Sequence, residues 1–374
     1  MSIRIKKIVG GKKDLRAFIH FYNKLYGSNP QVAFPLEFDE LSTLTKGKNP
    51  AHDICESSYW LAYRNNKVVG RIAAIINPIE QEKSTESIGR FGFFDFENDH
   101  EVSKVLMHTA LNWLKRKGVK TVHGPLGFTD LDRQGMLIYG FDREGTMATN
   151  YNHEYYIDHI EKLGFKKSVD WIEYRFEIES DVPEKIQKIS RFAQKRYGVK
   201  PLKAKSKKEL KRYVPDMFNL INDSYKDIYG YTNLTKEQID YYGKNYIGFV
   251  KKELVSLVLD KENKLVGIGI TMPSFTKALQ KARGRLLPFG WYHMLRSLNK
   301  NDTMDMYLIA VDTNYFDKGV AAVIIDEIYR SAIDFGIKKV ETNIELEDNH
   351  RVQSMWKYFN AEQHKRRRCY IKNI

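Results

Sequence analysis

Two glutamates near the end of the sequence are candidates for acid–base chemistry. Glu345 and Glu347 are two residues apart in a segment that we expect to be a β-strand, so their side chains would lie on the same face. A carboxylate placed in this way can take a proton from an attacking nucleophile, which is general base catalysis. The alternative is that both are solvated carboxylates at the end of a strand.

A glycine-containing loop before a long helix is a candidate anion site. The small and basic residues of this loop are Lys318, Gly319, Val320 and Ala321. The free N–H groups and the dipole of a helix N-terminus favour a phosphate group, and small residues let it approach closely. Asp317 would repel a phosphate or cap the helix, and Lys318 partly offsets its charge. An ordinary strand-to-helix turn is the alternative.

A third polar cluster lies in the first half of the chain, and an aromatic group follows it. Asp130, Asp132 and Arg133 are adjacent in a predicted loop, where two acids beside an arginine can position a cationic amine. Tyr151 begins a group of aromatic residues that can line a pocket. A hydrogen-bonded turn and simple helix packing are the alternatives.

The sequence shows no pattern typical of a metal site or a P-loop. Its His, Cys and acidic residues lack metal-ligand spacing, and the glycines at positions 10 and 11 lack the spacing of a phosphate-binding loop. Cys55 and Cys369 are the two cysteines, and they do not indicate a disulfide framework. We therefore expect no metal and a location in a reducing cytoplasm.

Charge and hydropathy narrow the class of protein. The 374 residues include 61 basic and 47 acidic side chains, a net charge of +14, but most lysines are dispersed as is usual on a solvated surface. The dense run at residues 365–368 is expected to be an edge strand protected by its charge. We find no apolar run long enough to span a membrane and expect no signal peptide. Contact with a membrane surface stays open.

The order of predicted elements recurs along the chain, which indicates a duplication. A β-hairpin is expected over residues 59–76 and again over residues 254–270, and each contains the string Lys-apolar-Val-Gly. Each hairpin is followed by a strand, a long helix that ends before a glycine, and another strand. The long helices are predicted over residues 100–117 and 318–335.

Each copy is therefore expected to be an α/β domain with a mixed central sheet flanked by helices. The chain length also favours two domains. A boundary at Pro183 fits both copies because proline biases the preceding residue away from helix. We predict one domain over residues 1–182 and another over residues 183–374, the second with a helix over residues 209–225.

This order of elements resembles the GNAT superfamily of acyl-CoA N-acyltransferases, and in particular its tandem proteins. The residues that carry the resemblance are 160–165, 318–321 and 345–349, and the loop at residues 124–135 is similar to one in a subfamily of bacterial tandem GNAT proteins. The resemblance covers nearly the whole chain in element order and part of the motifs. It implies direct acyl transfer from acyl-CoA to an amine. Some such relatives are associated with acylating long-chain amines in sphingolipid synthesis.

The resemblance also implies roles for particular residues of the second copy. Glu345 or Glu347 would be the base, and Tyr358 would stand in for the usual thiol-protonating tyrosine, because Trp356 lies at its expected position. Asn349 would contact the cofactor or simply cap a helix. Phe316 occupies a place where Gln or Arg is usual. The implied acyl-CoA-binding residues are Ile309, Val311, Lys318, Gly319, Val320, Ala321 and Asn349. The implied acceptor-binding residues are Asp130, Asp132, Arg133 and Tyr151.

Two further functions stay open beside the N-acyltransferase. A Fem-type aminoacyl transferase also has paired GNAT-like domains and uses charged transfer RNA, and the basic composition fits it, although we expect no long helical-hairpin insertion. A non-catalytic GNAT pair that binds a ligand or acts as a scaffold fits the missing loop Arg and the missing tyrosine. The first copy has several acids and no glycine at residues 97–101, so we expect no cofactor site there. We expect acyl-CoA and an amine as partners and no specific nucleic acid.

Overall fold

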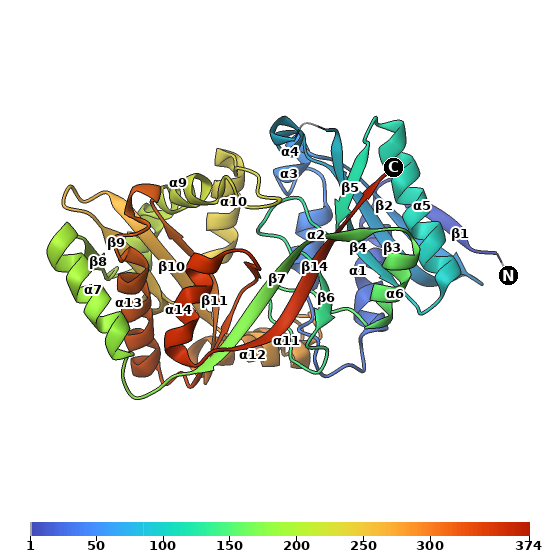
Figure 1. Cartoon of the computed structure of the whole chain (residues 1–374). Coiled ribbons are helices and arrows are strands. Elements are labelled where there is room, and N and C mark those ends of the chain that lie inside the picture. The colour runs from blue at the N-terminus through green and yellow to red at the C-terminus, as the bar shows by residue number, and fades with distance from the viewer. Residues whose placement is uncertain (1, 85) are drawn as a thin grey trace. The chain divides into compact units, whose positions relative to one another are not determined.

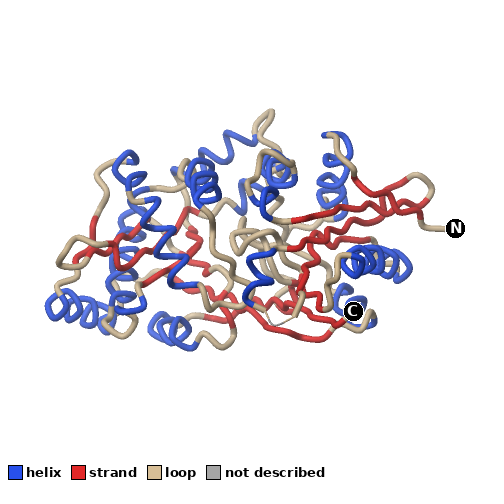
Figure 2. Tube along the Cα trace, turned by 90° about the horizontal axis from the view of Figure 1, so that it is seen from above, coloured by secondary structure: helices blue, strands red, loops and turns tan. Residues whose placement is uncertain are grey.

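The computed structural model describes residues 2–84 and 86–374, which form two compact units (Figure 1). Unit 1 comprises the chain up to Ile172 together with Thr276–Met294 and Lys365–Ile374, and unit 2 comprises Glu173–Phe275 and Leu295–His364. In each unit helices lie on either side of the strands (Figure 2). The predicted α/β class is confirmed. The division into residues 1–182 and 183–374 describes the sequence repeat rather than these units, and it stays a prediction.

Unit 1 is built on a mixed sheet. Its strands lie in the order β1 (Arg4–Ile8), β2 (Glu56–Arg64), β3 (Lys67–Ile76), β4 (Ile88–Phe96), β5 (Thr121–Gly124), β14 (Glu362–Asn373) and β7 (Lys166–Glu177), and β6 (Met136–Tyr139) pairs with β14. The pair of β4 and β5 is parallel, whereas β1 to β4 are antiparallel. The helices are α1 (Lys12–Leu25), α2 (Glu37–Leu44), α3 (Ala51–Ile54), α4 (Pro78–Lys83), α5 (His100–Arg116), α6 (Tyr155–Lys162), α11 (Thr276–Ala282) and the first half of α12 (Gly290–Asn299).

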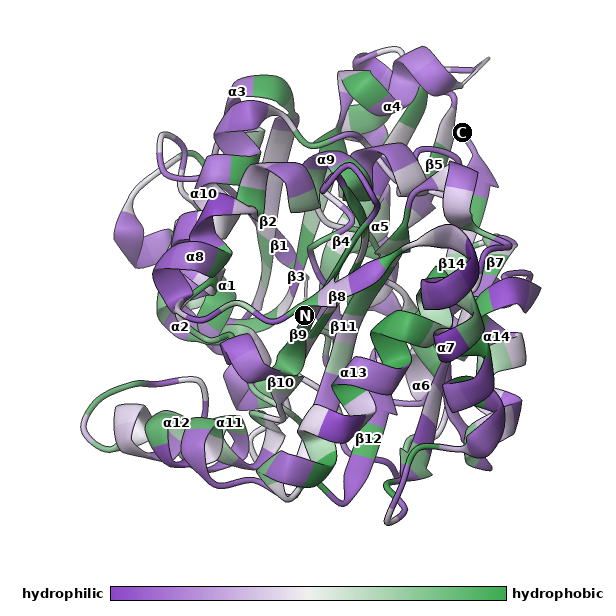
Figure 3. Cartoon of the chain, turned by 90° about the vertical axis from the view of Figure 1, so that its left-hand side faces the viewer, coloured by the Kyte–Doolittle hydropathy of each residue, from purple (hydrophilic) through white to green (hydrophobic). Residues whose placement is uncertain are grey.

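Unit 2 repeats this plan. After the second half of β7 its strands follow in the order β12 (Lys339–Thr342), β11 (Thr303–Val311), β10 (Leu265–Pro273), β9 (Val255–Leu259) and β8 (Lys200–Leu202), and β13 (Glu345–Leu346) pairs with β7. The helices are α7 (Glu184–Tyr197), α8 (Lys207–Arg212), α9 (Val214–Tyr225), α10 (Lys236–Tyr246), α13 (Val320–Phe335) and α14 (His350–Trp356). Short 3₁₀ helices are η1 (Lys252–Leu254), η2 (Thr313–Tyr315) and η3 (Lys357–Phe359). Figure 3 shows apolar residues mainly on strands and polar residues on outer helices such as α7.

The glycine of the repeated Lys-apolar-Val-Gly string has the same packing role in both units. A Cβ atom on Gly70 of β3 would lie 2.5 Å from Leu106 Cδ1 of α5, and one on Gly267 of β10 would lie 2.6 Å from Val320 Cγ1 of α13. Both distances are too short for a side chain, so glycine is what lets the long helix lie directly on the hairpin strand. The predicted duplication is thus visible in the packing of the two cores.

Each unit also contains a β-bulge on the strand that precedes its long helix. The register between β3 and β4 shifts at Arg71 and Ala73, and Phe93 of β4 adopts a φ of 48°. The register between β10 and β11 shifts between Ile270, which pairs with Leu308, and Thr271, which pairs with Met306. In both units the bulge lies between the second hairpin strand and the strand that precedes the long helix. Bulges bend a strand and are frequent beside functional sites.

Two predicted elements differ in the structure. The helix expected over residues 209–225 is two helices, α8 and α9, because Pro215 lies in the first turn of α9 and has no N–H to continue a helix. The segment between β10 and β11 folds into the short helices α11 and α12, which the sequence analysis did not anticipate.

The expected edge strand at residues 365–368 is wrong, because this run lies in the middle of the unit 1 sheet. Strand β14 is flanked by β5 and β7, and Lys365 and Arg367 are each 1% exposed. Arg368 Nε donates to Asp170 Oδ1 at 2.7 Å, and Arg366 Nη1 donates to Asp170 Oδ2 at 3.1 Å. Burial alone would raise the pKa of Asp170, but the hydrogen bonds from Arg368 and Arg366 lower it. Buried charge pairing replaces the exposure that the sequence suggested.

We predict that Asp170→Asn destabilises the protein strongly. The substitution removes the negative charge of a fully buried side chain and leaves Arg366 and Arg368 without their counter-charge. The free energy of unfolding should fall by about 3–5 kcal/mol. Urea denaturation at neutral pH measures the change. Asp158→Asn on α6, whose partner Lys162 is exposed, is the matched control and should cost far less. Equal losses for the two variants would show that the buried pair does not support the sheet.

Candidate active site in unit 2

Strands β11 and β12 diverge at the bulge. Their parallel pairing ends at Met306 and Thr342, and its last hydrogen bond runs from Asn343 N to Met306 O at 2.8 Å. Beyond this point the carbonyls of Ile309 and Val311 accept hydrogen bonds at 2.9 Å from Tyr225 Oη and Ser224 Oγ of α9. The carbonyls of these two predicted cofactor-binding residues are therefore hydrogen-bonded to α9, past the end of β12.

The loop after β11 presents the N-terminus of α13 without a cap. Gly319 is the N-cap in a left-handed conformation, with φ of 77° and ψ of 10°, and no side chain caps it. The first bonds of the helix run from Ala322 N and Val323 N to Gly319 O, so the N–H groups of Val320 and Ala321 precede the hydrogen-bonded helix. Asp317 does not cap this helix. The predicted anion site thus has the backbone that it needs.

Two cations border this loop. Lys318 Nζ lies 4.5 Å from the ring centroid of Tyr315. The Arg351 guanidinium of α14 lies 5.2 Å from the ring centroid of Phe316 and 3.8 Å from the Asp317 carboxylate. Arg351 therefore offsets the charge of Asp317, and it brings a guanidinium to the loop position where the superfamily resemblance leads one to expect Arg or Gln.

Glu345 has the most unusual environment of the predicted catalytic residues. It is half-buried, and both of its carboxylate oxygens accept a hydrogen bond from Trp356 Nε1 at 2.9 Å. Burial raises the pKa of Glu345. Hydrogen bonds from Trp356 and Thr342 lower it by less, so the pKa is about 8. A carboxylate with this pKa is a stronger base than an exposed glutamate once it is ionised.

The other predicted residues of this region lie in different settings. Strand β13 ends at Leu346, so Glu347 lies in the turn that follows rather than on the same strand. Asn349 caps α14, since its Oδ1 accepts from Val352 N at 3.4 Å. Tyr358 is 42% exposed on η3, whereas Trp356 is buried and holds Glu345. The structure thus brings Glu345 and Trp356 together and leaves Tyr358 at the surface.

The corresponding place in unit 1 is filled. Parallel pairing of β4 and β5 ends at Arg90 and His123, and the following loop packs on β4. Leu126 N donates to Phe91 O at 2.9 Å, and a Cβ on Gly92 would lie 2.2 Å from Leu126 O. The divergence between these strands is therefore occupied by the chain itself.

The N-terminus of α5 in unit 1 is also occupied by a side chain. Asp99 Oδ1 accepts from Glu101 N at 2.8 Å and from Val102 N at 3.4 Å. The other carboxylate oxygen of Asp99 lies 2.6 Å from Arg64 Nη1. An anion would have to displace this carboxylate to reach the backbone N–H groups of α5.

The predicted acceptor-binding residues make hydrogen bonds within unit 1. Asp132 Oδ2 accepts from the backbone N–H groups of Phe128 and Thr129, and burial raises its pKa to about 6. The remaining partners of this group are Gln134 Nε2 for Asp130, Met147 O for Arg133 and Phe141 O for Tyr151. These bonds hold the loop together, and an acceptor role for the four residues stays a prediction.

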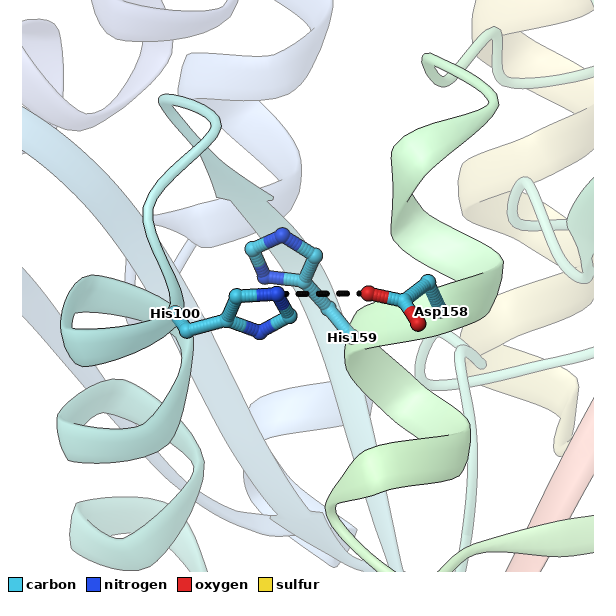
Figure 4. A group of neighbouring side chains, drawn as sticks. All are labelled: His100, Asp158 and His159. Carbon is cyan, nitrogen blue, oxygen red and sulfur yellow. Dashed lines mark ion pairs between the residues drawn. The ribbon is translucent and has the colours of Figure 1, made fainter.

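One group within residues 2–84 and 86–374 brings potential metal ligands together. Atoms of His100, Asp158 and His159 lie within 4.8 Å of one another (Figure 4). His159 uses both ring nitrogens for hydrogen bonds, at 2.8 Å to Ser103 Oγ and at 3.1 Å to Asn98 Oδ1. Because the nitrogens of His159 have protein partners, we assign no metal to this group.

Sequence reasoning missed Arg351 and the role of Trp356. Both residues follow the Glu345–Asn349 motif within a few positions. Because Phe316 stands where the superfamily has Gln or Arg, an arginine in this motif region, Arg351, could have been considered as a replacement for that side chain. The contact between Trp356 and Glu345 depends on how α14 folds back onto β13, which residue types alone do not define.

The chain is similar to two curated bacterial proteins. Protein YghO of Escherichia coli (strain K12) is 26% identical over 370 residues, which cover 97% of this chain and 94% of that protein. The bacterial ceramide synthase of Caulobacter vibrioides (strain NA1000 / CB15N) is 27% identical over 288 residues, which cover 75% of this chain and 73% of that protein. No protein-family model matches the chain.

Similarity to solved structures defines the fold. A tandem GNAT protein from the clavulanic acid biosynthesis pathway, in a structure without acetyl-CoA, superposes with a TM-score of 0.58 at 10% identity. The superposition covers 100% of this chain and 98% of that protein, so it includes both copies. This chain therefore has the fold of a tandem GNAT protein, with two GNAT-like domains in one polypeptide.

Proposed function

We propose that the protein is an acyl-CoA-dependent N-acyltransferase whose acyl-CoA site lies in unit 2. The observation that carries the proposal is the contrast between the two long helices. The N-terminus of α13 is uncapped at Gly319 and bordered by Lys318 and Arg351, whereas Asp99 caps the N-terminus of α5. A pyrophosphate suits the first setting and is repelled by the second.

The residues that would hold acyl-CoA follow from this arrangement. The N–H groups of Val320 and Ala321 would bind the pyrophosphate together with Lys318 and Arg351. The segment of β11 that contains Ile309 and Val311, past the end of β12, would bind the rest of the cofactor. Asn349 keeps its side-chain NH₂ group as a donor while its Oδ1 caps α14.

Glu345 is our candidate for the base. In the transfer the amine nitrogen forms a bond to the thioester carbonyl carbon and the carbon–sulfur bond breaks. The neutral amine nitrogen loses one proton and the leaving thiolate gains one. An acceptor that arrives as an ammonium ion first loses one further proton, which passes to solvent. Glu345, hydrogen-bonded to Trp356 and with a pKa of about 8, would take the proton from nitrogen. Tyr358 stays the candidate for the proton donor.

We further propose a long-chain or lipid amine as the acceptor. The support is the similarity to a ceramide synthase over three quarters of this chain. A ceramide is the amide of a fatty acid and a long-chain amino alcohol, so its formation is an N-acylation. Unit 1, whose own slot is filled by residues 125–128, would have a supporting role.

The basic run at residues 365–368 gives no support to transfer RNA as the donor. Binding of RNA needs exposed basic side chains, and this run is bound to Asp170 and to the backbone carbonyls of Glu144 and Asn150 instead. A non-catalytic pair is the other alternative, and the activity assay separates it from an enzyme.

The activity assay is release of free coenzyme A. Hexadecanoyl-CoA is incubated with dodecylamine or with a long-chain amino alcohol, and the thiol is measured with a thiol reagent while the amide is identified by mass spectrometry. Both cysteines are buried, so the protein itself contributes little thiol signal. We expect amide and thiol in equal amounts. Binding of acyl-CoA without turnover of any amine would favour the non-catalytic pair.

We predict that Ala321→Asp weakens acyl-CoA binding about tenfold or more, because it places a negative charge beside the proposed pyrophosphate position. The same charge favours the helix, since it lies in the first turn of α13, so the fold should persist. Ala321→Asn, of similar size and uncharged, is the control. Calorimetric titration with hexadecanoyl-CoA gives the affinities, and equal affinities for the two variants would contradict a pyrophosphate at α13.

We predict a pH-dependent stability effect for Glu345→Gln. Glu345 has a raised pKa when folded, so the folded state is penalised increasingly as pH rises from about 4.5, where the unfolded side chain ionises, towards about 8. The neutral variant escapes this penalty. Its melting temperature relative to the unaltered protein should therefore rise across this window and level off above it.

Glu347→Gln is the matched control for this measurement, because Glu347 is two residues away, in the turn that follows β13. Its difference from the unaltered protein should not follow the same course between pH 5 and pH 8. A flat difference for Glu345→Gln over this range would show that the Glu345 environment does not raise its pKa.

A further inference from the structure

The loop before α12 and the start of this helix expose a run of large apolar side chains. The exposed fractions are 78% for Leu287, 68% for Phe289, 49% for Trp291, 49% for Tyr292 and 50% for Leu295. We call these five residues, which fall within nine consecutive positions, the 287–295 patch. Single exposed apolar residues are common, but a contiguous group of this kind marks a binding surface.

Helix α12 is amphipathic in the reverse of the usual sense. Trp291, Tyr292 and Leu295 share one side of the helix because Leu295 follows Tyr292 by three residues and Trp291 by four, and all three are exposed. The opposite side carries Met294, which is 5% exposed, with the half-buried His293 and Ser297. A surface helix normally turns its large apolar residues towards the core. The outward side of α12 is therefore suited to contact with an apolar phase or an apolar partner surface.

The patch is held in place by a tight turn. Trp291 N donates to Leu286 O at 2.9 Å, and Trp291 Nε1 donates to Pro288 O at 3.0 Å. A Cβ on Gly290 would lie 1.8 Å from Arg285 O, so this turn requires glycine. The aromatic side chains are therefore presented by ordered backbone and not by a loose tail.

The preceding residues tie the patch to the rest of unit 1. Glu37 N of α2 donates to Gly284 O at 2.9 Å, and Arg285 Nε donates to Glu37 Oε1 at 2.9 Å. Gln280 of α11 donates to Pro30 O at 2.7 Å. These bonds anchor the base of the segment while its tip stays exposed.

Basic residues surround the patch. Residues 276–300 contain six Lys or Arg and no Asp or Glu. All six are exposed. Arg285 pairs with Glu37, and the other five are Lys277, Lys281, Arg283, Arg296 and Lys300. Figure 3 shows these two helices and their connecting loop, in which apolar and hydrophilic residues alternate. Two copies of such a surface would repel each other, so the charge favours an anionic partner.

The geometry points to docking of the 287–295 patch on an anionic phospholipid membrane. Trp and Tyr prefer the membrane–water interface, and Leu and Phe insert below it. Lys and Arg beside them are attracted to anionic headgroups. No helix in the described part of the chain is long and apolar enough to cross a membrane, so the contact would be at the surface. The inference does not depend on acyl transfer, although it would bring the protein to a lipid acceptor.

Vesicle binding without any acyl-CoA tests this inference. Sedimentation with vesicles that contain phosphatidylglycerol should capture the full-length protein, and vesicles of phosphatidylcholine alone should capture much less. The double variant Phe289→Ser/Trp291→Ser should bind the anionic vesicles about tenfold more weakly or worse, because two aromatic anchors are lost. Phe192→Ser on α7, where Phe192 is 60% exposed, is the matched control and should bind as the unaltered protein does.

Intrinsic fluorescence gives a second, independent measurement. The other four tryptophans, Trp60, Trp113, Trp171 and Trp356, are buried, so a blue shift on adding anionic vesicles reports on Trp291. Trp291→Phe should abolish the shift and keep the binding. Absence of binding by the unaltered protein, undiminished binding by the double variant, or a dimer that the double variant dissociates would each overturn the proposal.

Discussion

The buried Asp170 carboxylate, held by Arg366 and Arg368, is the interaction on which the fold most depends. It fixes the last strand of the chain, β14, between β5 and β7 in the sheet of unit 1. Burying the Asp170 carboxylate is costly unless positive charge compensates it, and the partly exposed Arg366 and Arg368 supply that charge.

The two copies share the packing of a long helix on a β-hairpin and differ at the N-terminus of that helix. Gly70 and Gly267 let both long helices pack closely on the second strand of the hairpin, and a bulge follows in both units. In unit 1 the chain fills the space past the bulge with Leu126 and caps the helix with Asp99. In unit 2 the N-terminus of α13 is uncapped, and the half-buried Glu345 is hydrogen-bonded to Trp356.

Local features of this structure could be predicted from sequence, and long-range pairings could not. The Lys-apolar-Val-Gly strings, the long helices and the glycine before α13 follow from periodicity and residue type. The basic run was misplaced because its partner Asp170 lies 196 residues before Arg366, and charge alone indicates a surface. The place of Arg351 over Phe316 and the bond from Trp356 to Glu345 likewise arise only when α14 folds back.

Amide hydrogen exchange with and without hexadecanoyl-CoA tests the central claim most directly, because the proposed site is made largely of backbone N–H groups. Peptides that contain Gly319, Val320 and Ala321, and those from the second half of β11, should exchange more slowly with the ligand present. Peptides over residues 97–102 should be unchanged. Protection at residues 97–102 without any at residues 307–321 would contradict the account and place acyl-CoA in unit 1.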